Sequence, residues 1–136
     1  MADLSITVAN VVAGSGSSVT EGTAGAALTA GQVVYLDSAA NTYKLADCNS
    51  ATAAVRSPAG IALHAASANQ PIAVLTRGPI TIGATMTAGV GYWLSGTPGG
   101  IRPVADNTTG DYPTLLGVST STTVLDVKIH ETGVLL

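Results

Sequence analysis

A strict alternation of apolar and polar residues constrains the fold of this chain more than any other feature. It spans residues 125–130, where three apolar residues alternate with three polar ones: Leu125, Val127 and Ile129 against Asp126, Lys128 and His130. Successive side chains of a β-strand point to opposite faces, so this pattern is typical of a strand with one buried face. Patterns with the helical period are nearly absent elsewhere, and the sequence therefore predicts an all-β protein.

Further short strands are predicted where apolar and β-branched residues lie between turn sequences. They span residues 32–36, 60–63, 72–77, 79–82, 91–94 and 115–118. Clusters of Gly, Pro, Asn, Asp and Ser separate them, and Arg77-Gly78-Pro79 predicts a turn between two of these strands. The Ala-rich residues 48–55 are the one place where a helical turn is predicted.

The first 27 residues differ in character from the rest. Leu4, Ile6 and Val8 alternate with polar residues, which predicts a short strand, and two further valines follow it. Residues 13–27 are small, polar and rich in Gly, which is typical of a flexible linker. We therefore expect residues 1–27 to form a strand and an extended Gly/Ser-rich arm. The arm residues expected to contact a partner by strand addition are Leu4, Ile6, Val8, Val11 and Val12.

An internal repeat organises residues 28–136. Leu28-Thr29-Ala30-Gly31 recurs as Met86-Thr87-Ala88-Gly89, and at the same spacing Tyr35-Leu36 recurs as Trp93-Leu94. Gly60-Ile61 matches Gly117-Val118 at nearly the same spacing. Each of the two β-units, about 28–83 and 86–136, is too small to bury its own apolar face. We therefore expect them to pack together as one compact barrel or sandwich.

Charged side chains are scarce. They make up 10% of the chain and give a net charge of −3, whereas about 25% is usual for a soluble domain. Five dispersed basic residues provide no positive patch for nucleic acid or for an anionic membrane. A surface with so few charges has little protection against association, so we expect a homo-oligomer, most simply a trimer.

The sequence offers no clear reactive group, and no catalytic, cofactor-binding or metal-binding residue is predicted. The single cysteine, Cys48, excludes an internal disulfide, and no neighbouring base or cation marks it as a nucleophile. His64 and His130 are well separated and do not form a zinc motif. Phosphate-loop and nucleophile-elbow motifs are absent as well.

The apolar runs are too short to span a bilayer, and the N-terminal residues do not resemble a signal peptide.

Tyr35 and Trp93 are the aromatic residues at matching positions of the repeat. Two such rings could form a platform for stacking a sugar. Matched aromatic residues that follow a shared Ala-Gly turn are more often packing anchors, and this is the interpretation that we favour.

The repeated sequence carries a resemblance. Thr-Ala-Gly-x-x-x-Tyr/Trp-Leu occurs at residues 29–36 and 87–94, and is followed by Gly-Ile-Ala-Leu at 60–63 or by Leu-Gly-Val-Ser at 116–119, and then by an alternating strand. This arrangement resembles the small head decoration (cement) proteins of tailed bacteriophages, including a capsid-decoration family that was once mislabelled as a recombinase. The resemblance covers residues 28–136.

The resemblance implies an all-β body, usually trimeric, on the outer surface of an icosahedral head at three-fold and local three-fold positions. The expected function is that of a structural virion protein. It would stabilise the capsid by bridging subunits of the major capsid protein, without catalysis or cofactor. The alternative hypothesis is a carbohydrate- or receptor-binding β-module of a phage fibre or spike, which needs exposed aromatic residues beside polar side chains.

Overall fold

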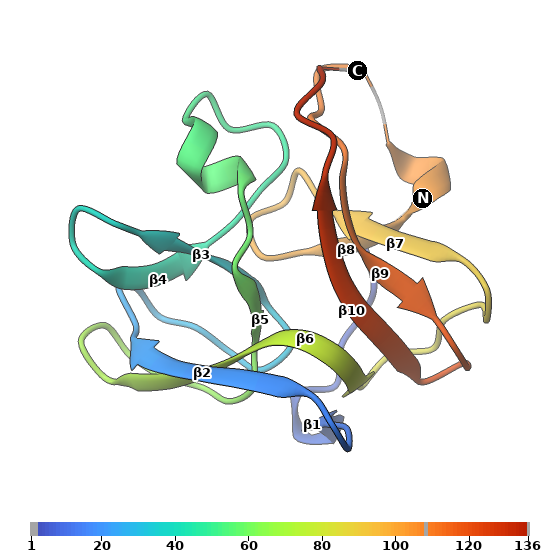
Figure 1. Ribbon diagram of the computed structural model, residues 1–136, viewed down its shortest axis with the longest axis horizontal. Helices are drawn as coiled ribbons and strands as arrows, with labels where there is room; N and C mark the ends of the chain where they lie inside the picture. Colours follow the sequence, from blue (N-terminus) through green and yellow to red (C-terminus); the bar gives the residue numbers. More distant parts are fainter. Residues whose placement is uncertain (1–2, 108, 136) are drawn as a thin grey trace.

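The computed structural model describes residues 3–107 and 109–135, and it confirms the all-β prediction (Figure 1). Three short 3-10 helices accompany the strands: η1 (Val8–Asn10), η2 (Ala53–Arg56) and η3 (Val104–Asp106). The strands of the described residues are β1 (Val11–Ala13), β2 (Ser18–Thr23), β3 (Val33–Asp37), β4 (Thr42–Leu45), β5 (Gly60–Ala62), β6 (Pro71–Ile82), β7 (Gly91–Leu94), β8 (Ile101–Pro103), β9 (Thr114–Ser119) and β10 (Val124–Glu131).

The strands form one curled, antiparallel, half-barrel sheet in the order β4-β3-β5-β6-β10-β9-β7-β8. The long strand β6 joins its two halves, because β6 pairs with β2 and β5 along its first half and with β1 and β10 along its second. In Figure 1, β2 and β6 run along the bottom, β3 and β4 lie on the left, β5 lies near the centre, and β7 to β10 lie on the right.

The turn predicted at Arg77-Gly78-Pro79 is wrong, because β6 runs through these residues without interruption. Gly78 has a φ of +103°, and a Cβ at this position would lie 2.7 Å from the Cα of Ser17. Only glycine combines that backbone conformation with so close an approach of another chain segment. The Gly-Pro signal therefore marks a bend within one strand.

Two buried clusters hold the sheet together. The larger lies between the two halves and includes Val33, Ile61 and Leu75 from the first half with Leu116 and Leu125 from the second. The smaller lies within the first half, whose curl brings β4 back to the end of β2 at a bridge between Tyr43 and Ala24. Strands β3 and β5 therefore contact a core on both faces, which explains their uninterrupted apolar sequences.

Strand β10 confirms the alternation prediction. Leu125 and Val127 are buried, and Asp126 and Lys128 are exposed. A register shift between Val127 and His130 interrupts the pairing with β9 further along the strand, and a bulge of this kind increases local twist. The predicted helical turn corresponds to η2, at the end of the Ala-rich segment.

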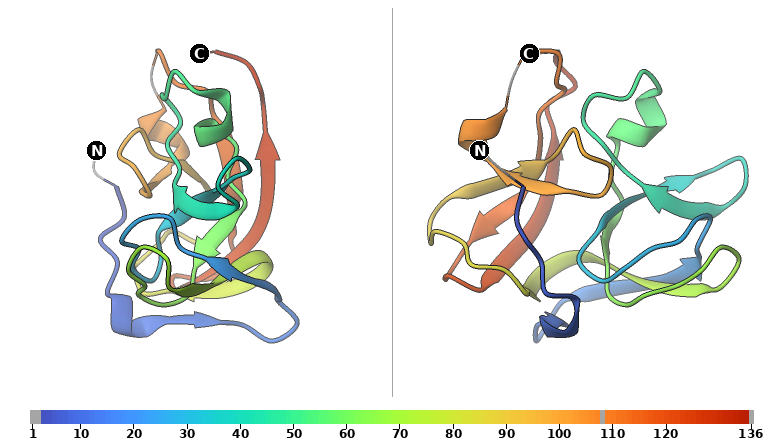
Figure 2. Two further views of the ribbon diagram at one scale, coloured as in Figure 1. Left: turned by 90° about the vertical axis from the view of Figure 1, so that its left-hand side faces the viewer. Right: turned by 180° about the vertical axis from the view of Figure 1, so that it is seen from behind.

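The prediction of an N-terminal strand followed by a linker is wrong in two respects. The strand expected at Leu4, Ile6 and Val8 is absent, and the expected linker contains β2, which pairs with β6 of the same chain. The accessible surface of 6382 Å² is close to the about 6,500 Å² expected of a compact monomer of this size. No long arm therefore extends from the described residues. The right-hand view in Figure 2 shows this N-terminal segment (dark blue) running across the body.

Candidate functional site

The arm residues expected to contact a partner divide into two groups. Leu4 and Ile6 are half-buried and Val11 is buried, and all three pack against the larger core of their own chain. The backbone N–H of Leu4 donates a hydrogen bond to the Ile101 carbonyl (2.7 Å). Val8 and Val12 remain 53% and 58% exposed. Of the five, only these two present a side chain that is mainly available to a partner.

Val12 lines an open groove of about 590 Å³ between η1, β1 and the end of β6. Five of its ten lining residues carry hydroxyl groups and none carries a charge; the hydroxyl residues are Ser5, Thr7, Thr81, Thr85 and Thr123. A groove without charged or aromatic groups lacks the usual means of holding an ionic ligand or stacking a sugar. It suits close contact with an uncharged protein surface.

Tyr35 and Trp93 lie at matching places in the two hairpins. Tyr35 pairs with Lys44 across β3 and β4, and Trp93 pairs with Arg102 across β7 and β8. Both aromatic side chains are half-buried, and Tyr35 packs against the larger core. The indole Nε1 of Trp93 is buried and has no hydrogen-bond partner among the described residues. Neither ring stands free in solvent as an open stacking platform would require.

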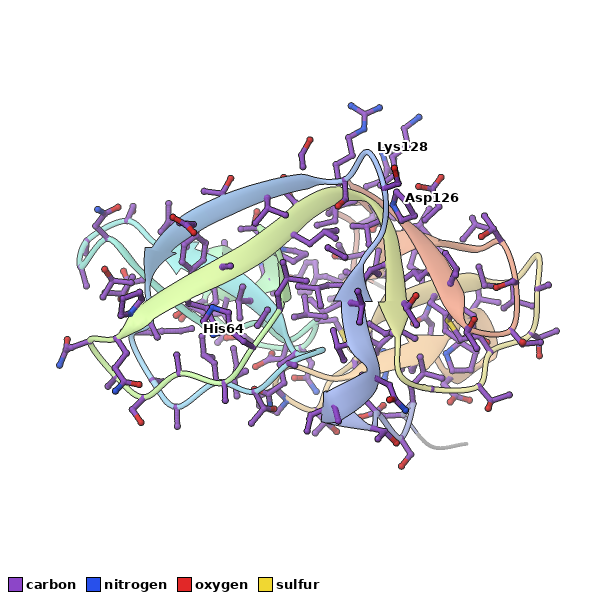
Figure 3. The ribbon with its side chains drawn as sticks, turned by 90° about the horizontal axis from the view of Figure 1, so that it is seen from below. His64, Asp126 and Lys128 are labelled. Atoms are coloured by element: carbon purple, nitrogen blue, oxygen red, sulfur yellow. The ribbon has the colours of Figure 1, made fainter. Side chains whose placement is uncertain are left out.

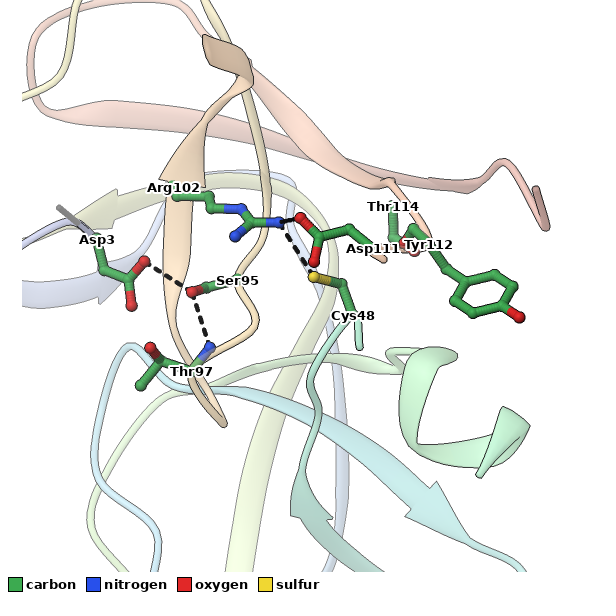
Figure 4. Close-up of polar contacts among 8 residues, drawn as sticks. All are labelled: Asp3, Cys48, Ser95, Thr97, Arg102, Asp111, Tyr112 and Thr114. Carbon is green, nitrogen blue, oxygen red and sulfur yellow. Dashed lines mark hydrogen bonds and ion pairs between the residues drawn. The ribbon is translucent and has the colours of Figure 1, made fainter. Parts of the chain in front are cut away.

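A buried polar cluster, which the sequence did not indicate, lies beside β8 (Figure 4). The Arg102 guanidinium donates to the Asp111 carboxylate and contacts the Cys48 sulfur at 3.2 Å. Arg102 and Asp111 are 9% and 4% exposed, and Cys48 is fully buried. A buried ion pair is costly to desolvate, so each partner depends on the other.

The environment of Cys48 does not suit nucleophilic chemistry. Burial raises the pKa of the Cys48 thiol to about 12, the Arg102 charge opposes this change, and Asp111 adds to it. Only the thiolate is an effective nucleophile, and a thiol with this pKa stays protonated near neutral pH. The group therefore serves as a packed core side chain.

A second set of polar contacts fixes the N-terminal segment. The Ser95 hydroxyl donates a hydrogen bond to the Asp3 carboxylate (2.7 Å) and accepts one from the backbone N–H of Thr97 (3.0 Å) (Figure 4). The bond to Asp3 ties the start of the described chain to the end of β7.

A cation–π contact joins η2 to the segment before β9. The Arg56 guanidinium stacks over the Tyr112 ring at 3.7 Å from its centroid.

The two histidines do not form a site. His64 lies beyond β5, where its Nε2 accepts a hydrogen bond from the backbone N–H of Ala73 (3.1 Å) and its Nδ1 lies 3.0 Å from the Ala65 carbonyl oxygen. His130 is exposed on β10, the strand on which Asp126 and Lys128 project from the surface (Figure 3). In the part of the chain that the structure describes, no group of His, Cys, Asp and Glu side chains could hold a metal ion.

Comparison with known proteins does not assign the chain to a family. No protein-family model matches it, and no curated protein matches it significantly. Within the described ranges, no helix is long and apolar enough to cross a membrane. Two surfaces are the candidate functional features: the uncharged groove around Val12 and the exposed strands of the sheet.

Proposed function

We propose that this chain is a structural virion protein that decorates and stabilises the outer surface of an icosahedral bacteriophage capsid. The observation that carries the proposal is that both copies of the Thr-Ala-Gly sequence have the same backbone geometry. Gly31 and Gly89 have φ values of +88° and +84°, and their N–H groups donate at 2.8 Å to the carbonyls of Ala62 and Ser119. Shared geometry supports reading the two copies as one structural unit used twice.

The strand pairing supports a duplicated domain over residues 28–136, with units at about 28–83 and 86–136. Each unit has a hairpin whose first strand pairs with a third strand, and the third pairs with the last. The registers agree residue by residue; matching pairs are Tyr35–Lys44 with Trp93–Arg102, Val34–Gly60 with Tyr92–Gly117, and Ala62–Val74 with Ser119–Leu125. The resemblance to decoration proteins rests on the same repeated sequence.

The distribution of charge supports an assembled state. Asp37 forms an ion pair with Lys44 at 2.8 Å, and Arg102 with Asp111, so four of the charged residues are neutralised within the chain. Much of the remaining surface presents hydroxyl, small and apolar side chains, which allow close contact between subunits without desolvation of charge. We accordingly propose a homotrimer that contacts major capsid protein subunits.

The mechanism is mechanical. A trimer on a three-fold position contacts several capsid subunits at once, so that individually weak contacts give tight binding through high effective concentration. By joining neighbouring subunits it opposes their separation under the outward pressure of packaged DNA. This function needs no reacting group, which is consistent with the protonated Cys48 thiol.

Sedimentation with capsids tests the proposal. Purified protein is mixed with phage heads that were assembled without it, and the pellet is analysed. We expect saturable co-sedimentation in a fixed ratio to the capsid protein. Protein that stays in the supernatant, but binds an immobilised glycan through Tyr35 or Trp93, would overturn the proposal in favour of a carbohydrate-binding module.

A further inference from the structure

The side of β2 that faces away from β6 is an uncovered strand edge. All residues of β2 except Gly22 are exposed, and Val19 is 46% exposed. In Figure 3, β2 (blue) forms the upper margin of the molecule, with β6 (yellow-green) below it. The bridge between Ala24 and Tyr43 covers only the far end of this edge.

Hydrogen bonds on the other side of β6 show which backbone groups of β2 point outward. Ala73 uses its N–H for His64 (3.1 Å) and its carbonyl for the N–H of Leu63 (3.0 Å), so both groups point away from β2. Glu21 is the register partner of Ala73. In an antiparallel pair of this kind, the N–H and C=O of Glu21 also point away from the partner strand. Among the described strands β2 pairs with β6 alone, so no neighbouring strand takes up these two groups.

The second half of the molecule shows what covers the matching edge. The last residues of β6 lie against β10 in the same way that β2 lies against β6. The pairs Ile80–Leu125 and Thr81–Val124 in the second half correspond to the pairs Thr20–Val74 and Glu21–Ala73 in the first half. There the outer edge is occupied by β1, whose Val12 pairs with Thr81. The chain thus contains its own example of a short strand added at this position, and at β2 the position is open.

The chemistry of the edge restricts the strand that could occupy it. Glu21 is the one charged residue of β2, and it lies where Thr81 lies in the second half. A carboxylate directly opposite another carboxylate is destabilising, whereas an opposite charge is favourable. Pairing of two β2 edges about a two-fold axis brings their Glu21 side chains close together, which disfavours a second copy as the occupant.

We infer that the outer edge of β2, over Val19–Glu21, binds an extended segment of a partner protein as an added antiparallel strand. The segment has small or β-branched apolar residues, as β1 has, with a lysine or arginine opposite Glu21. Main-chain hydrogen bonds hold the segment, and the charge pair sets its register. The identity of the partner rests on the proposed function, under which the segment belongs to a capsid subunit.

Peptide titration monitored by two-dimensional amide NMR tests the inference. The first probe is a blocked peptide with the sequence of residues 10–14, Asn-Val-Val-Ala-Gly, and the second replaces its central valine, at the position of Val12, by lysine. At millimolar peptide we expect shifts of the Val19, Glu21 and Thr23 amides, slower hydrogen exchange at Glu21, and about two- to fivefold tighter binding of the lysine peptide.

The Glu21→Lys variant provides the matched control. Since residue 21 is exposed, the variant keeps its spectrum elsewhere, and it should reverse the preference between the two peptides. Shifts outside β2, or none with either peptide, would overturn the inference. Concentration-dependent shifts of β2 without peptide would identify a second copy as the occupant and overturn it as well. Neither result bears on whether the protein sediments with capsids, so the two proposals fail separately.

Discussion

Two matched glycines in the middle of the sheet offer the sharpest test of the strand pairing. Gly60 lies between β3 and β6, and Gly117 lies between β7 and β10. A Cβ on Gly60 would overlap the carbonyl oxygen of Leu75, and a Cβ on Gly117 would overlap that of Asp126. In each case the obstacle is backbone of the adjacent strand, which cannot rotate away.

We expect Gly60→Ala and Gly117→Ala each to lower the free energy of unfolding by about 3–5 kcal/mol. Overpacking costs about 1–3 kcal/mol, and separating the strands weakens hydrogen bonds that contribute about 1 kcal/mol each. The midpoint of thermal unfolding should fall by roughly 10–20 °C. Urea denaturation followed through the fluorescence of Trp93, the single tryptophan, measures the change.

Gly91→Ala is the control substitution. Its Cβ would meet only side-chain atoms, Leu115 Cδ1 at 3.3 Å and Trp93 Nε1 at 3.4 Å, which can adjust, so the cost should stay below about 1 kcal/mol. If Gly60→Ala and Gly117→Ala were as mild as this control, the close approach of the strands would be refuted, and with it the registers that support the proposed duplication.

Three further outcomes are expected, each measured by denaturant unfolding. In the folded state the pKa of the Cys48 thiol is about 12, compared with an ordinary value of 9.0. The stabilisation of the folded state by this protonated thiol is therefore complete below pH 9 and is lost as the pH rises toward 12. Relative to Cys48→Ser, the wild type should lose about 2–3 kcal/mol between pH 9 and 11; parallel profiles would contradict this. Asp111→Ala should cost about 3–5 kcal/mol by leaving the Arg102 charge buried, whereas replacing both residues with apolar ones should restore most of the loss. Removal of residues 1–12 should cost about 3–5 kcal/mol, because Leu4, Ile6 and Val11 leave the core; an unchanged midpoint would show that this segment is passive.

Much of the sheet could be predicted from local pattern. The strands β3, β5, β7, β9 and β10 were expected within about one residue, because each has an apolar face bounded by turn residues. The same rules missed β1, β2, β4 and β8. In β2 nearly every side chain is exposed, so burial imposes no alternation on its sequence, and only its pairing with β6 makes it a strand.

The errors at the N-terminal segment and at Gly78 share a physical cause. A Gly-rich sequence permits a linker, but it also permits a chain to pass closely over another, as Ser17 passes over Gly78. Composition cannot distinguish these cases, because the distinction depends on tertiary contact. The cluster of Arg102, Asp111 and Cys48 was missed for a related reason: Cys48 lies 54 residues from Arg102 in the sequence, and the three side chains meet only in the folded chain.

The proposed stabilisation of the capsid is tested most directly by the thermal stability of packaged heads with and without this protein. DNA release on heating is followed with an external dye for heads assembled without the protein, for the same heads after it is added, and for heads given the heat-denatured protein as a control. We expect the native protein to raise the temperature of DNA release in a saturable manner. Release at an unchanged temperature from heads saturated with bound protein would contradict it.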